Sequence, residues 1–342
     1  MCGTTGNIDF ESQSIEQVYV QGVGIQNEDA IVCRPEIGLF AVIDGATALY
    51  ADLALSGAVA AQAVKTALDG WDGNGGLIDA VMAANRYLGQ VTGGDALDKT
   101  ARPTCCIAAV RVRNDRLEFA QVGDCMAFVE YKHWGTPGQS DSHGKDSPSP
   151  RDGTGTRTDF IRQLTHDSVA AFDTHSVQML VQAWNCRLAA DVEQSPDAST
   201  PPPRAKDLSS WSVDKQLDVL KEIRSELRPV LARHREMMNV SGGYSVMDGS
   251  AEVERFIEHG AINASLISRV LLMSDGLQLP TSKLHTKNGW LGTAMYGFYH
   301  GVRSLCSHVL ELENQDPGCY VYPRLKPHDD KSGLLVTITD LK

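Results

Sequence analysis

The sequence lacks the features of a chain that crosses or leaves a membrane. Its longest apolar runs, such as Ile107 to Val110 and Val270 to Met273, are far shorter than the roughly 20 residues that a membrane helix needs. The first residues, MCGTTGNIDFESQ, have neither the basic start nor the apolar stretch of a secretory signal. These absences predict a cytoplasmic protein that has no membrane partner.

Two further classes of site have little support. The 31 Lys and Arg are outnumbered by 43 Asp and Glu, giving a formal net charge of −12 without a basic stripe, so nucleic acid is not an expected partner. The eight cysteines form no CxxC pair and have no His at zinc-site spacing, which argues against a disulfide framework and a structural zinc. What remains is a chain of 342 residues, 42% hydrophobic, that can bury a large core.

The pattern of apolar residues predicts a mixture of strands and helices. Short β-branched and apolar stretches predict strands at 18–23, 30–33, 39–43, 105–112, 116–122, 126–131, 270–273 and 333–339. Apolar residues at helical spacing predict helices at 51–68, 77–88, 169–190, 212–238 and 290–312. We expect the three consecutive strands between 105 and 131 to form a β-meander, because turn dipeptides join them.

Two segments have a composition that cannot support a core. Residues 132–158 consist mainly of Gly, Ser, Pro, Asp and His, which predicts a flexible loop insertion at the surface. Residues 193–206 contain SPDASTPPPR, which predicts a Pro/Ser-rich linker inside an added helical region at 169–238. There are no internal repeats. The sequence therefore predicts one domain over 1–342 that carries these two insertions.

Acidic residues stand where the apolar strands stop. Asp44 directly follows the run 39–43, and Asp275 follows the run 270–274. Further acids lie beside other predicted strands, namely Asp124, Asp329-Asp330 and Asn27-Glu28-Asp29. If these strand ends meet, their carboxylates repel one another in a partly desolvated cleft, and hard cations relieve that repulsion. Oxygen ligands without His or Cys favour Mg²⁺ or Mn²⁺ over zinc.

A pair of such cations is suited to the hydrolysis of phosphate esters. It lowers the pKa of a bridging water, neutralises phosphoryl oxygens and fixes an in-line geometry. Gly45 has no Cβ, so its backbone carbonyl can approach a cation as an additional ligand. The competing interpretation is that Asp-Gly is merely a turn, and we assign the Asp-Gly pairs at 69, 72, 152 and 248 to turns. Asp44 and Asp275 differ because each follows a continuous apolar strand, where an uncompensated carboxylate is costly.

The order and spacing of several motifs resemble one known family. These motifs are Asn27-Glu28-Asp29, FAVIDGAT at 40–47, RPTCCIAAV at 102–110, FAQVGDCMAF at 119–128, LTHDS at 164–168, VLLMSDGL at 270–277 and DDKSGLLVTI at 329–338. Together they resemble the metal-dependent protein phosphatases of type 2C, particularly the bacterial members. The resemblance covers nearly the whole chain apart from 132–158 and 193–206. It implies an α+β fold, a four-layer α-β-β-α sandwich of two antiparallel sheets flanked by helices, with metals at one end.

The resemblance also implies roles for seven residues around two Mn²⁺ or Mg²⁺ ions and a weaker third site. Asp44 is expected to bridge two metals and, with Asp275, to be central to catalysis by a metal-bridging water. The remaining expected roles are the carbonyl of Gly45 on one metal, Asp275 and Asp329 on the other, Asp124 with Asp275 at the third site, and Glu28 and Asp29 on metal-bound waters. No organic cofactor is expected.

The sequence departs from the family pattern at two positions. Gly24 stands where the family commonly has an Arg that binds the substrate phosphate, and Ala46 stands where it often has a His proposed as a general acid. Phosphate binding is then left to the metals alone or to a cation from elsewhere, such as Arg34 or Arg102.

Three other features lie in or near these motifs. We expect a structural role for His166 and a site-tuning or simple loop role for His328. The segment 237–256 is expected to be a substrate-facing loop followed by a helix.

The leading functional interpretation is hydrolysis of phosphoserine or phosphothreonine on a protein substrate. The first alternative is a pseudophosphatase that binds a partner without turnover, which the missing Arg and His favour. The second is a metal phosphohydrolase acting on a small molecule. The acidic net charge predicts basic or neutral substrate segments. Nothing in the sequence indicates an oligomeric state.

Overall fold

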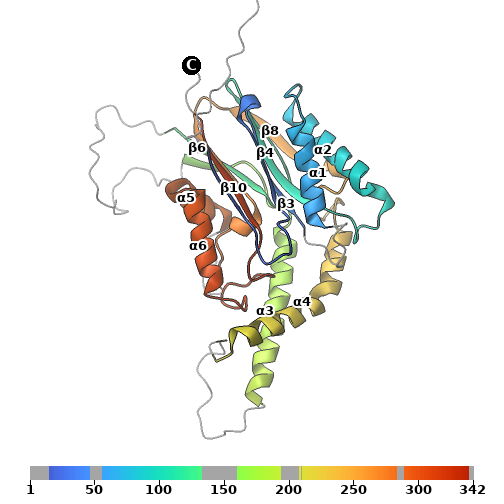
Figure 1. The fold of residues 1–342 in the computed structure, drawn as a ribbon, viewed down its shortest axis with the longest axis vertical. Helices are drawn as coiled ribbons and strands as arrows, with labels where there is room; N and C mark the ends of the chain where they lie inside the picture. Colours follow the sequence, from blue (N-terminus) through green and yellow to red (C-terminus); the bar gives the residue numbers. More distant parts are fainter. Residues whose placement is uncertain are drawn as a thin grey trace, which may run out of the picture.

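Two antiparallel five-stranded sheets lie face to face, and a pair of helices covers the outer face of each sheet (Figure 1). The computed structural model describes residues 15–46, 56–132, 160–193, 208, 210–282 and 289–338. This arrangement confirms the predicted four-layer sandwich. Within the described ranges, no helix is both long and apolar enough to cross a membrane.

The first sheet has the order β2-β3-β4-β5-β8 and is covered by helices α1 and α2. Its strands are β2 (Ala30–Arg34), β3 (Leu39–Gly45), β4 (Cys105–Arg113), β5 (Arg116–Val122) and β8 (Glu258–Asn263). The second sheet has the order β1-β10-β9-β6-β7 and is covered by α5 and α6. Its strands are β1 (Ile15–Val20), β6 (Met126–Tyr131), β7 (Ile161–Gln163), β9 (Ile267–Met273) and β10 (Lys331–Thr337). The helices are α1 (Gly57–Asp69), α2 (Leu77–Thr92), α3 (Ala170–Glu193), α4 (Val213–Glu236), α5 (Gly289–His300) and α6 (Val302–Asn314).

The alternation of side chains along β3 explains how a strand that is apolar throughout is buried on both faces. Leu39, Ala41 and Ile43 pack with residues of α1 and α2, whereas Phe40 and Val42 pack between the two sheets. Asp44 continues the second series by two residues. The strand therefore directs its last acidic side chain toward the end of the space between the sheets.

The predicted β-meander is wrong, because its third strand belongs to the other sheet. β4 and β5 form an antiparallel hairpin, but β5 pairs on its other side with β8, and β6 pairs with β9 and β7. The chain crosses between the sheets at Gly123, which has a φ of +92°. A side chain there would collide with Cys106, so the crossover needs glycine for both reasons.

Other predicted elements differ in extent. The expected helix 290–312 is two helices, α5 and α6, because Gly301 between them has a φ of +86°. The sequence did not indicate β7 or β8; β7 has only three residues, and β8 contains a glycine and exposed polar positions. Within 237–256 the structure has turns and a single 3-10 turn at Glu252–Arg255 in place of the expected helix.

Some predictions fall on parts of the chain that are not described. The insertion 132–158 lies outside the described residues except for its first residue, and the linker 193–206 does so except for Glu193. The start of the predicted helix 51–68, residues 51–55, is outside them as well.

Helices α3 and α4 extend from the end of the sandwich and form a core of their own (Figure 1). Trp184 of α3 packs in this core with Leu220 and Ile223 of α4, and Cys319 from the segment before β10 completes it. α4 changes direction along its length, and Pro229 stands inside it. Proline removes a backbone donor and clashes with the preceding turn, which accounts for the bend.

Candidate metal centre and its cavity

One end of the sandwich opens into a cavity of about 490 Å³, which is lined by acids from four separate strand ends. Asp44 comes from the end of β3, Asp124 from the crossover between β5 and β6, Asp275 from the turn after β9, and Asp329 from the segment before β10. We call these four residues the acid floor. Gly45 lines the same cavity. The structure thus brings together five of the seven residues that the sequence singled out.

The remaining two residues, Glu28 and Asp29, are placed differently from each other. Asp29 is buried beside the acid floor, and Ser274 Oγ donates a hydrogen bond of 3.0 Å to its Oδ2 atom. Glu28 is not in the cavity lining, and its Oε1 atom accepts a hydrogen bond of 3.2 Å from the backbone N–H of Gly57. Asp29 therefore adds a buried carboxyl group beside the acid floor, whereas Glu28 contacts the first residue of α1.

Burial and mutual repulsion keep several of these acids from ionising together. Burial, with the charges of Asp29 and Asp275, raises the pKa of Asp44 well above the usual range of a carboxyl group. Burial, with the charge of Asp275, does the same to the pKa of Asp124. Burial raises the pKa of Asp29 to about 8, and nearby Asp329 adds to that shift. A cation is needed to hold all of these groups in the ionised form.

Asp329 is the exception within the acid floor. Burial alone would raise its pKa, but the ammonium group of Lys326 lies 2.6 Å from its Oδ1 atom, and the pKa of Asp329 is lowered as a result. Lys326 also lines the cavity. No pattern in the sequence singles out this lysine, because it stands three residues from an acid in a segment without periodicity.

The oxygen atoms of the site fit a hard divalent cation. Among the described residues, Asp29 Oδ1 and Asp124 Oδ1 are buried without a hydrogen-bond partner, which is costly unless a cation binds them. Ligand atoms of Asp44, Asp124 and Cys125 lie within 4.8 Å of one another. Burial and the nearby carboxylates of Asp44 and Asp124 raise the pKa of the Cys125 thiol, so it stays protonated and is a poor ligand. The available donors are therefore carboxylate oxygens, which suit Mg²⁺ or Mn²⁺.

Gly45 is required by packing as well as by its position in the cavity. A Cβ atom at Gly45 would lie 2.5 Å from the carbonyl group of Gly57 and would also collide with the Glu28 carbonyl oxygen. The start of α1 thus packs directly on the end of β3. This close approach holds the backbone beside Asp44 in place.

Neither arginine that the sequence offered as a phosphate ligand faces the cavity. Arg34 donates hydrogen bonds to the backbone carbonyls of Leu68 and Trp71 at the far end of α1. Arg102 is buried and forms an ion pair of 2.8 Å with Asp248. Both guanidinium groups are therefore used to fasten parts of the chain together.

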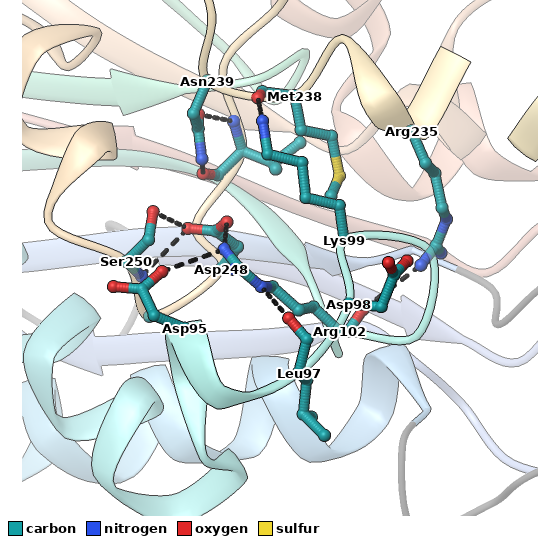
Figure 2. Close-up of polar contacts among 12 residues, drawn as sticks. Asp95, Leu97, Asp98, Lys99, Arg102, Arg235, Met238, Asn239, Asp248 and Ser250 are labelled. Carbon is teal, nitrogen blue, oxygen red and sulfur yellow. Dashed lines mark hydrogen bonds and ion pairs between the residues drawn. The ribbon is translucent and has the colours of Figure 1, made fainter. Parts of the chain in front are cut away.

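Figure 2 shows how Arg102 joins two loops beside the cavity. Its guanidinium group also donates to the Leu97 carbonyl at 2.9 Å, while Lys99 Nζ donates to the Met238 carbonyl at 2.7 Å. Arg235, at the end of α4, donates to the Arg102 carbonyl at 3.2 Å. These contacts fix the segment after α4, which places Tyr244 and Val246 in the cavity lining. Asp248-Gly249 is a turn as expected, and its buried carboxylate has this additional structural role.

The histidines named from the sequence lie outside the cavity lining. The backbone N–H of His166 donates to Glu258 Oε2 at 2.8 Å, and its carbonyl accepts from Gln121. His328 Nδ1 lies 2.9 Å from Glu313 Oε2. The imidazole that does line the cavity is His234 of α4, which contacts His175 of α3 at 3.0 Å.

Helix α3 adds an acid that the sequence analysis missed. Asp173 lines the cavity, and burial with the charge of Asp275 raises its pKa to about 8. It stands in the first turn of α3, where an acid is ordinary, so its position in the sequence carried no signal.

No protein-family model matches the chain, and no curated protein matches its sequence. Among solved structures, the serine/threonine phosphatase Stp1 from Staphylococcus aureus is similar with a TM-score of 0.50 and 13% identity, over 99% of each chain. The Mycobacterium tuberculosis serine/threonine phosphatase PstP/Ppp has a TM-score of 0.48 and 18% identity, over 95% of this chain and 98% of that one. The catalytic domain of PstP in complex with two manganese ions gives the same TM-score, identity and coverage. The likeness to Stp1 shows a shared fold, and the fold that the motifs predicted is confirmed.

Proposed function

We propose that this chain acts as a single-domain, metal-dependent phosphatase that removes phosphate from phosphoserine or phosphothreonine in proteins. The observation that carries the proposal is the convergence of Asp44, Asp124, Asp275 and Asp329 on one cavity. Buried carboxylate oxygens without partners among the described residues, and a fold shared with a serine/threonine phosphatase, support it.

The acid floor and the Gly45 carbonyl are the proposed metal ligands. Asp44 would contact two ions, the Gly45 carbonyl would bind one of them, and Asp275 with Asp329 would bind the other. Asp124 with Asp275 would hold a weaker third ion, and Asp29 would hold water next to them. Bound Mn²⁺ or Mg²⁺ would supply Lewis acidity that lowers the pKa of a water molecule and neutralises phosphoryl oxygens. We assign Glu28 to supporting the contact between Gly57 and the end of β3.

The protein's own groups complete the charge balance of the cavity. Burial disfavours the ammonium form of Lys326, but the adjacent Asp329 raises the pKa of Lys326, so it remains a cation beside the substrate phosphate. Asp173 lines the same cavity, and in the metal-free protein burial together with the charge of Asp275 raises its pKa to about 8. Lys326 and Asp173 thus bring ionisable groups to the cavity, whereas Gly24 and Ala46 have no side chain that could bind phosphate or donate a proton.

The test is hydrolysis of a chromogenic aryl phosphate and of a phosphothreonine peptide, each with Mn²⁺, with Mg²⁺ or with chelator. We expect both substrates to be hydrolysed only with metal. Failure of both substrates under every condition would favour the pseudophosphatase, which the residues at positions 24 and 46 suggest. Hydrolysis of the aryl phosphate alone would favour a small-molecule phosphohydrolase.

A further inference from the structure

One face of α4 forms a wall of the cavity that also contains the acid floor. The helix residues that line the cavity recur every three or four positions, as one face of a helix must. They are Lys221, Arg224, Ser225, Leu227, Arg228, Leu231, His234 and Arg235. We call Lys221, Arg224 and Arg228 the cationic wall.

The charges of α4 are segregated between the cavity and the solvent. The helix also carries Glu222 and Glu226, but neither is in the cavity lining, and Glu226 pairs with Arg187 of α3 at 2.5 Å. Every ionisable α4 side chain that lines the cavity is a cation or a histidine. If this face of α4 were only solvated, acidic side chains would not need to be kept out of it.

The cationic wall has no partner among the residues that the structure describes. Lys221, Arg224 and Arg228 take part in no hydrogen bond or ion pair there, although Lys221 and Arg228 are exposed and Arg224 is half-buried. Lys326, by contrast, is paired with Asp329 in the same cavity. Three cations that have no partner among the described residues therefore line the same cavity as the acid floor and can contact a ligand there.

The dimensions of the wall suit a peptide. From Lys221 to Arg228 the helix rises about 10 Å at 1.5 Å per residue. An extended peptide covers that length with about three residues at roughly 3.3 Å each. A peptide segment of about three residues can therefore contact the length of the wall, which lines the same cavity as the acid floor.

Resting on the proposed phosphatase function, we propose that the cationic wall selects phosphopeptides that carry a second anionic group near the phosphorylated residue. That group is a glutamate or aspartate side chain or a second phosphate, which share the same negative charge. The proposal replaces the expectation of basic or neutral substrate segments, because the local charge of the cavity governs recognition more directly than the net charge of −12.

The test compares two phosphothreonine peptides that differ only in their flanks, glutamates in one and lysines at the same positions in the other. We expect kcat/KM for the glutamate peptide to exceed that for the lysine peptide by about tenfold at low salt, with the difference mainly in KM. A doubly phosphorylated peptide with neutral flanks separates a second phosphate from acidic side chains.

The double variant Arg224→Glu/Arg228→Glu should abolish or reverse the ratio. Arg233→Glu makes one such charge reversal, half of the change in the double variant, on an exposed α4 residue outside the cavity lining and should leave the ratio unchanged.

A binding measurement gives a readout that does not depend on turnover. In chelator, fluorescence anisotropy of a labelled, unphosphorylated glutamate peptide should show binding that weakens about tenfold in the double variant and not in Arg233→Glu. Equal kcat/KM for both peptides, or a ratio that the double variant does not change, would overturn the inference while metal-dependent hydrolysis still supported the phosphatase. Absence of hydrolysis with every metal would overturn the phosphatase instead, and the anisotropy would then decide whether the wall binds anions.

Discussion

The acid floor and the cationic wall face the same cavity but have different structural origins. The acids extend from strand ends of the two packed sheets, and most of their surroundings are buried backbone and core. The cations stand on a helix outside the sandwich, and most of them reach solvent. We infer from this difference that the proposed metal chemistry belongs to the fold, whereas the proposed substrate preference belongs to the helices added to it.

The largest effect is expected from the acid floor. Asp44→Asn and Asp275→Asn should each lower turnover of an aryl phosphate by at least about a thousandfold, because each removes a proposed metal ligand. Circular dichroism and thermal unfolding in chelator should show an intact fold, since removing one of several clustered carboxylates relieves repulsion. Asp72→Asn is the matched control: Asp72 is also followed by glycine but lies in an exposed turn. Turnover retained in either floor variant would contradict the site assignment.

The second prediction concerns the buried ion pair of Arg102 with Asp248, which connects two loops beside the cavity. Asp248→Ala leaves the buried Arg102 guanidinium without its main partner, and the free energy of unfolding should fall by about 3 kcal/mol. The exposed ion pair of Arg86 with Glu254 is the comparison, and Arg86→Ala should cost less than about 1 kcal/mol. Chemical denaturation with fixed metal measures both. Similar losses of unfolding free energy in the two variants would show that burial does not determine how much the Arg102–Asp248 ion pair contributes.

The acid floor could be predicted from the sequence because each acid lies within two residues of the end of a strand. A strand that is apolar throughout must be buried on both faces. Asp44 and Asp275, at the ends of two such apolar runs, therefore needed a partner to compensate their charge. The cationic wall could not be predicted in the same way. Lys221, Arg224 and Arg228 have a spacing that is equally typical of a solvated helix face, and only the packing of α4 against the cavity distinguishes the two.

Local signals also failed where the chain changes sheets. The turn at Gly123-Asp124 has the composition of a hairpin, so β6 was assigned beside β5, and only the pairing of β5 with β8 excludes that arrangement. Lys326 and Asp173 were missed for a related reason. Each is unremarkable in its own segment and gains its role from acids that are distant in the sequence.

The third prediction uses pH to test the burial of Asp29 and its repulsion by the acid floor. In metal-free protein the pKa of Asp29 is raised from 3.8 to about 8. Below pH 4 both the folded and unfolded states hold this proton, but between pH 4 and 8 only the folded state does. Stability must therefore fall as pH rises through that window. We expect the melting temperature in chelator to drop by about 5 °C between pH 5 and pH 8.

Saturating Mn²⁺ should remove most of this pH dependence, because bound cations allow the carboxylates to ionise in the folded state. Asp29→Asn should reduce the drop in chelator, and Asp72→Asn should leave it unchanged. A melting temperature that rises with pH in chelator would mean that the acids are already compensated without metal. In that case the carboxylates of the acid floor would be solvated, as the exposed cations of the cationic wall are.

The smallest effect is expected from the bend that orients the wall. Arg235 fastens the end of α4 to the loop at Arg102, so the direction of the first half of the helix depends on the bend at Pro229. Pro229→Ala restores a backbone donor and should straighten α4, raising the helical signal in circular dichroism. The preference for glutamate-flanked over lysine-flanked peptide should then fall about twofold to threefold, as expected for displaced surface charges. Aryl phosphate turnover should stay the same, because the acid floor does not depend on α4. If the peptide preference stayed unchanged while aryl phosphate turnover became slower, α4 would contribute to the chemistry and not to substrate preference.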